Sequence, residues 1–163
     1  MHFSFIKELF PKYDVDILFE NCIETVYINN KQYSDAVIIH HFPDDYYIYI
    51  LKFATQHRDI SSQRELIECV QSFVSGEKAA IEFFENGKNQ FGGEIAVSFL
   101  EDLTYDKLRN YFGYPNTDLS NLTFKVRAWD NRYCFDGCFH KNDYGTIDIV
   151  KNIIVPLTAK CTP

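Results

Sequence analysis

The chain has 163 residues, of which 46% are hydrophobic, 24% charged and 17% aromatic. This size and composition predict one folded domain spanning residues 1–163, and they exclude disordered and collagen-like chains. The 16 Lys and Arg against 23 Asp and Glu give a net charge of −7. An acidic chain of this kind argues against direct binding of nucleic acid. We also expect no membrane association, because the apolar runs are too short for a membrane span. A cytoplasmic location is expected because Met1–Ile6 is followed at once by Lys7 and Glu8, without the apolar stretch of a signal peptide.

The charge is unevenly distributed along the chain. Residues 1–106 carry 18 acidic and 8 basic side chains, whereas residues 107–163 carry 5 and 8. A partner recognised through charge would therefore be basic and would contact the first two thirds of the chain, although solubility alone also explains such a balance. The five cysteines are odd in number and scattered, which favours reduced thiols over a disulfide framework.

In the first half, the pattern predicts a short helix at 4–10, ended by Pro11, and then strands at 23–28, 36–42 and 46–53. The strand at 46–53 has apolar side chains on both alternating faces, so we expect it in the middle of a sheet that is covered on both sides. A helix is predicted over 62–75. It opens with the capping box of Ser62 and Glu65 and ends before Gly76.

In the second half, strands at 79–85 and 94–100 flank a hairpin turn at 86–89, and Gly92-Gly93 suggests a bulge. A short helix at 104–112 and three strands complete the chain, the strands at 122–129, 132–140 and 146–155. About eight strands in hairpin order with two or three helices predict an α+β fold built on mostly antiparallel sheet.

Two groups of residues could carry metal or acid–base chemistry. Cys134, Cys138 and His140 share strand parity, but no second ligand pair accompanies them, and metal binding there stays open. His40 and His41 precede Asp44 and Asp45, which suggests a small-molecule site or an enzyme. Adjacent strand residues point to opposite faces, however, so at most one histidine could serve such a site. Nucleotide-binding and hydrolase motifs are absent, and we expect a protein that is not an enzyme and has no cofactor.

Aromatic and acidic residues occur side by side at several places in the chain. Protein interfaces favour aromatic anchors, and carboxylates select basic partners. Alternation also places Glu82 and Phe84 on the strand face opposite Ile81 and Phe83. The predicted partner-binding residues are Asp44, Asp45, Tyr46, Tyr47, Glu82, Phe84, Glu85, Trp129 and Asp130.

In size, charge and β-rich order the chain resembles the immunity proteins that bacteria make against their own toxins, in particular those of contact-dependent growth-inhibition systems. The resemblance implies a protein-binding inhibitor that neutralises a basic, nuclease-type toxin by binding and occluding it. Some of these proteins accept a β-hairpin of the toxin, which requires an exposed strand edge. A small-molecule-binding domain or enzyme, and a structural or adaptor subunit, are the alternatives. The sequence does not indicate the oligomeric state.

Overall fold

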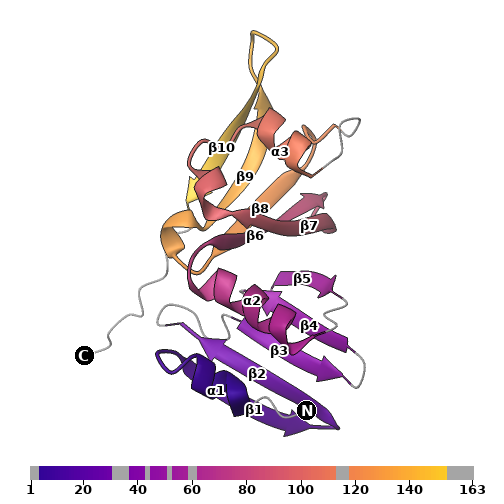
Figure 1. The fold of residues 1–163 in the computed structure, drawn as a ribbon. Coiled ribbons are helices and arrows are strands. Elements are labelled where there is room, and N and C mark those ends of the chain that lie inside the picture. The colour runs from indigo at the N-terminus through magenta and orange to yellow at the C-terminus, as the bar shows by residue number, and fades with distance from the viewer. Residues whose placement is uncertain are drawn as a thin grey trace, which may run out of the picture.

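The structure is a computed structural model with two antiparallel β-sheets and three α-helices in its described part (Figure 1). The α+β class predicted from the sequence is confirmed. About eight strands were predicted, and ten are found in the described part of the chain. The structure describes residues 4–30, 37–42, 45–50, 53–58, 62–112 and 118–153.

The first sheet is a meander in which each strand pairs with the next along the chain. Helix α1 (Ser4–Leu9) precedes it and helix α2 (Gln63–Val74) follows it. Its strands are β1 (Asp14–Glu20), β2 (Ile23–Asn29), β3 (Val37–Phe42), β4 (Asp45–Ile50) and β5 (Phe53–Arg58).

One face of this sheet forms the first hydrophobic core. Strand β2 alternates strictly, with Val26 and Ile28 fully buried and Thr25 and Tyr27 half-buried on the other face. The buried face packs against both helices, since apolar residues of α1 and α2 belong to the same cluster. Ser62 caps α2 by accepting a hydrogen bond from the backbone N–H of Glu65, as the capping box predicted.

The second sheet contains the strands of the second half in the order β10-β9-β8-β6-β7. The 3-10 helix η1 (Val97–Leu100) and helix α3 (Tyr105–Tyr111) add residues to a second core beneath it, and η2 (Asn131–Tyr133) joins two of its strands. The strands are β6 (Lys78–Glu85), β7 (Lys88–Ala96), β8 (Thr123–Ala128), β9 (Phe135–Lys141) and β10 (Ile147–Ile153).

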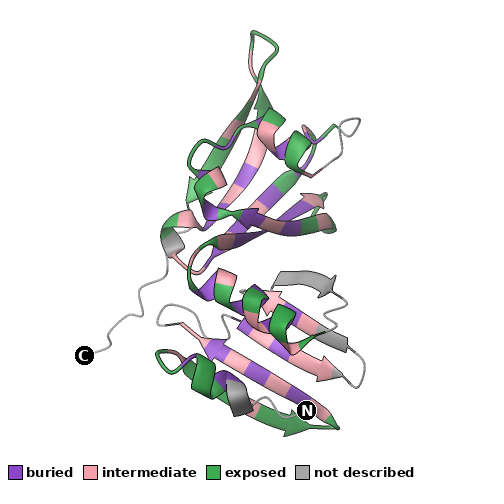
Figure 2. Cartoon of the chain, viewed as in Figure 1, coloured by how far each residue is buried: buried purple, intermediate pink, exposed green. Residues whose placement is uncertain are grey.

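The two sheets meet along β5, which contacts β6 and β7. Strand β6 serves both cores: Ala80 belongs to the first cluster, whereas Ala79 and Ile81 belong to the second. Figure 2 shows the resulting alternation of buried and less buried positions along the strands. No helix in the described part of the chain is long and apolar enough to cross a membrane.

The structure corrects several local predictions. Strand β1 was not predicted, and the segment predicted as one strand at 46–53 divides between β4 and β5. The expectation that this strand is covered on both faces was wrong, because Ile48 is buried in the first core while Tyr47 and Tyr49 are only half-buried on the opposite face. The predicted strand at 94–100 ends at Ala96 and continues as η1. The bulge lies opposite Phe83 and Phe84, near Gly92-Gly93 but not at these glycines.

Candidate partner-binding site at Trp129

A pocket of about 690 Å³ lies where the start of β1 and the end of β2 meet the segment that follows β8. Aromatic, carboxylate and amide side chains from three separate parts of the sequence therefore share one cavity. Its lining residues are Lys12, Tyr13, Asp14, Asn29, Asn30, Trp129 and Asp130.

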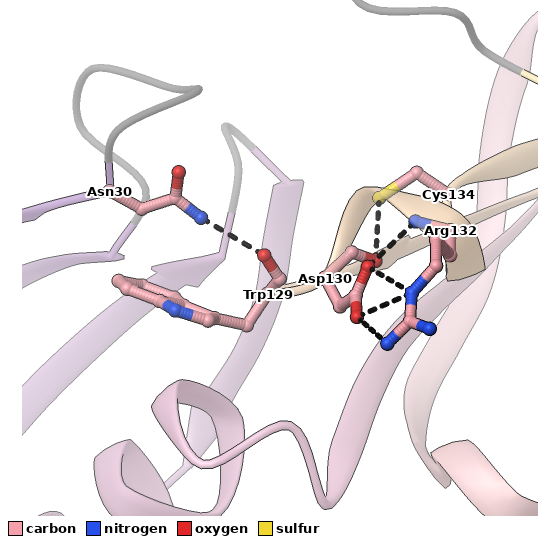
Figure 3. Close-up of polar contacts among 5 residues, drawn as sticks. All are labelled: Asn30, Trp129, Asp130, Arg132 and Cys134. Carbon is pink, nitrogen blue, oxygen red and sulfur yellow. Dashed lines mark hydrogen bonds and ion pairs between the residues drawn. The ribbon is translucent and has the colours of Figure 1, made fainter.

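The aromatic wall of the pocket is held in place by contacts with the first core. The Tyr13 and Trp129 rings meet edge to face, with centroids 5.2 Å apart, and both pack against the first hydrophobic cluster. The Tyr13 hydroxyl donates a hydrogen bond of 3.2 Å to the carbonyl of Val74 at the end of α2. The amide nitrogen of Asn30 donates a 3.0 Å bond to the Trp129 carbonyl (Figure 3). The ring contact and these bonds hold Tyr13 and the backbone of Trp129 against the first core.

Asp130 stands beside the indole but is oriented away from it. In Figure 3 its carboxylate faces Arg132, whose guanidinium donates several hydrogen bonds, including one of 2.9 Å from Nε to Oδ2. These bonds hold the pKa of Asp130 below its usual range. The Cys134 thiol points toward the Asp130 carbonyl, 3.9 Å away, and lies 3.3 Å from the Ala128 carbonyl. The turn that presents Trp129 and Asp130 is thus fixed by side chains on both sides.

Asp14 is the second carboxylate of the pocket, and it is exposed. The Asn29 amide nitrogen lies 3.4 Å from an oxygen of Asp14 and 3.4 Å from an oxygen of Asp16. No ion pair among the described residues involves either aspartate. Asp14 is therefore a charged group of the pocket that forms no ion pair among the described residues, although Lys12 lines the same pocket.

The two aromatic rings and the Asp14 carboxylate form an environment suited to an ammonium or guanidinium group. The ring faces attract a cation, and a carboxylate can accept paired hydrogen bonds from arginine. In the described part of the chain, no group of three His, Cys, Asp or Glu residues is arranged to hold a metal ion.

The structure brings together only two of the predicted partner-binding residues, Trp129 and Asp130. Tyr47 lies on the half-buried face of the first sheet, far along the sheet order from β1. Asp45 and Tyr46 begin β4, but their side chains lie outside the described part of the structure, and Asp44 lies outside the described residues altogether.

The remaining predicted residues lie on β6 in the second sheet. Phe84 is half-buried, with the Lys125 ammonium 5.0 Å from its ring centroid, and Glu85 is exposed. Glu82 was predicted at the surface, but only 4% of it is exposed. Burial raises the pKa of Glu82, although a hydrogen bond from Asn89 and the charges of Lys125 and Arg127 oppose this shift.

The histidines of β3 lie on opposite faces of the first sheet, as strand parity predicted. His40 Nδ1 is 2.9 Å from the Thr25 hydroxyl, and burial lowers the pKa of this histidine. Its neighbours on this face include the Tyr49 ring, which it meets edge to face. Cys134 belongs to the second core, whereas Cys138 is half-buried on β9, so these two thiols do not share one site.

Sequence reasoning missed the N-terminal side of the pocket. Tyr13-Asp14 is an aromatic residue followed by an acid, the same pairing that singled out Trp129-Asp130. Applying that criterion throughout the chain would have found it. The two asparagines carried no comparable signal, because their role follows from the pairing of β1 with β2.

No protein-family model, no curated protein and no solved structure has a significant match to this chain.

Proposed function

We propose that this protein is a protein-binding inhibitor of the immunity type, which neutralises a basic, nuclease-type toxin in the cytoplasm by binding and occluding it. The observation that carries the proposal is the pocket at Trp129. Two residues selected from the sequence as partner contacts, Trp129 and Asp130, line it together with Tyr13 and Asp14. A lysine or arginine of the partner would pack beside this aromatic pair and meet the Asp14 carboxylate.

The overall charge supports the same class of partner. The net charge of −7 would accelerate association with a basic protein through long-range attraction and would disfavour direct contact with nucleic acid. An inhibitor that acts by occlusion needs no catalytic group of its own. Its partner loses activity because the partner's own site is covered.

The proposal is tested by capturing the partner and then measuring inhibition. Tagged protein is incubated with an extract of its native host and washed at low and then at high salt, and retained proteins are identified by mass spectrometry. The purified partner is assayed for nuclease activity with increasing amounts of the protein. We expect a basic protein whose activity falls to background at a one-to-one ratio. A basic partner that stays fully active in the saturated complex would exclude the inhibitor function.

The pocket's part in binding is tested with Trp129→Ala and Asp14→Lys. Truncating a central aromatic anchor commonly costs tenfold or more in affinity, so each variant should raise the dissociation constant by roughly that factor. Tyr144→Ala is the matched control, because Tyr144 is 93% exposed at the turn between β9 and β10. Equal affinity of all three variants and the unaltered protein would remove the pocket from the interface.

A further inference from the structure

The face of the first sheet that points away from α1 and α2 is not covered by any helix or strand of the described residues. Its side chains are half-buried or exposed and alternate with those of the first core. Cross-strand pairing forms two rows of side chains across β2, β3 and β4. One row contains Thr25, His40 and Tyr47, and the other contains Tyr27, Ile38 and Tyr49. The described side chains of this open face are Asp14, Asp16, Leu18, Glu20, Ile23, Thr25, Tyr27, Asn29, Ile38, His40, Tyr47 and Tyr49.

We propose that this open face, continuous with the Trp129 pocket, is the surface that receives a basic protein partner. The inference rests on the proposed function for the class of partner and adds where that partner binds. It also assigns a binding role to Tyr27 and Tyr49, which the sequence did not single out.

The charge of the open face determines which partner it fits. Its described side chains include three carboxylates, all on β1, and no lysine or arginine. Tyrosines on the neighbouring strands offer large, rigid contact areas with a polar tip, the side chains most common at interface centres. A surface with aromatic residues at its centre and carboxylates along one edge is complementary to a basic partner.

The pocket and the open face share residues. Asp14 and Asn29 line the pocket, and by strand alternation they lie on the open face with Asp16 and Tyr27. The Asn29 amide bridges Asp14 and Asp16 at 3.4 Å each, so the pocket opens directly onto the row of β1 carboxylates. One partner could therefore insert a basic side chain at Trp129 and cover the tyrosines.

The corresponding face of the second sheet is built differently. Two of its acids are already paired with cations: Glu94 with Lys78 and Asp136 with Arg127, each pair at 2.7 Å. A basic partner that binds there would have to break these ion pairs or place its own cations beside Lys78 and Arg127. The open face of the first sheet has no such competition within the described part of the chain.

The test locates the binding site of a cationic peptide on the full-length chain by nuclear magnetic resonance. Nitrogen-15-labelled protein is titrated with a deca-arginine peptide, and a deca-glutamate peptide serves as the charge control. With deca-arginine we expect saturable chemical-shift changes at Asp14, Asp16, Tyr27, Tyr49 and the Trp129 indole. With deca-glutamate we expect no chemical-shift changes. Shifts centred on Phe84 and Glu85, or no saturable shift, would overturn the proposal. Shifts that depend on protein concentration without peptide would also overturn it, because a second copy would then occupy the face.

Variants separate an aromatic contribution from a general charge effect. Asp16→Lys should weaken deca-arginine binding about tenfold, whereas Asp143→Lys, the same charge change at an exposed turn, should alter it less than twofold. Tyr27→Thr keeps a strand-forming residue while removing the ring, and Tyr144→Thr is its control. Equal effects of the two aspartate variants would show that only net charge matters and would overturn the assignment.

The outcome is distinguishable from that of the proposed function. If deca-arginine binds the open face but the host yields no basic partner, the inhibitor function fails and the surface assignment stands. If a basic partner is captured and inhibited but protects β6 rather than β1 and β2 from hydrogen exchange, the function stands and this assignment fails.

Discussion

The charged residues of the two sheets have different neighbours. In the second sheet, lysine and arginine stand against carboxylates on the face opposite the core, as in the Arg127–Asp136 pair. In the first sheet, Asp14 and Asp16 of β1 are joined by the amide of Asn29 and form no ion pair among the described residues. On the proposal made above, the carboxylates of β1 are the ones that an external cation would neutralise.

The two cores also differ in composition. The first is mostly aliphatic, built from residues such as Val26, Ile28 and Leu66. The second is a network of rings in which Phe83 contacts Phe91 and Phe124, with centroids 4.6 and 5.8 Å apart. Aromatic pairs add about 0.5–1.5 kcal/mol beyond their buried area, so each ring of the second core is coupled to its neighbours.

The largest expected effect tests whether the two cores unfold together. Phe83→Ala should lower the free energy of unfolding by about 3–5 kcal/mol, because this fully buried ring contacts several others. Trp129 is the only tryptophan and packs against the first core, so its fluorescence reports that core during urea unfolding. Because β6 belongs to both clusters, fluorescence and circular dichroism should shift together. An unchanged fluorescence midpoint would show that the first sheet unfolds independently.

The next effect concerns a close contact inside the second sheet. A Cβ atom added to Gly137 would lie 2.2 Å from the Phe124 ring, so Gly137→Ala forces the ring to move. Overpacking of this kind costs about 1–3 kcal/mol, which urea unfolding would measure. A smaller side chain should relieve the contact, and Gly137→Ala combined with Phe124→Leu should cost less than the sum of the two single changes. If the two single costs simply add, the destabilisation by Gly137→Ala does not come from its contact with the Phe124 ring.

Short-range signals predicted the elements well, and long-range contacts account for what was missed. The capping box at Ser62 and the Asn86-Gly87 turn, with φ of 49° and 78°, were recognised because their chemistry lies within a few residues. The burial of Glu82 and the pocket around Trp129 depend on which strands become neighbours. Residues that are 99 positions apart, Asn30 and Trp129, form the key hydrogen bond, and no local pattern encodes such a pairing.

Helix caps provide a smaller and matched comparison between the two halves. Ser62 accepts a hydrogen bond from the Glu65 N–H in α2, and Thr104 accepts one from the Lys107 N–H in α3, each of 3.2 Å. Ser62→Ala and Thr104→Ala should each lower the free energy of unfolding by about 1 kcal/mol. Thermal unfolding followed by circular dichroism measures both. A cost confined to one variant would mean that packing alone holds the other helix.

The smallest effect at neutral pH, and the one with a defined pH dependence, is expected at Glu82. Burial raises the pKa of this carboxyl in the folded protein above its unfolded value, so the charged form is disfavoured by folding. Its stabilising contribution is complete below the unfolded pKa and is lost as the pH rises through the folded pKa. The bond from Asn89 and the charges of Lys125 and Arg127 partly offset the burial, which keeps the effect small.

Glu82→Gln removes the ionisation while keeping the shape of the side chain. The variant should therefore be more stable than the unaltered protein at pH 7, and the advantage should shrink as the pH falls toward the ordinary range of a glutamate. Urea unfolding from pH 4 to pH 8 measures this difference, and Glu85→Gln, on the exposed end of the same strand, should show none. A variant that is less stable at pH 7 would mean that the charged carboxylate is needed beside Lys125. The junction between the sheets would then be held by an ion pair, like the rest of the second sheet.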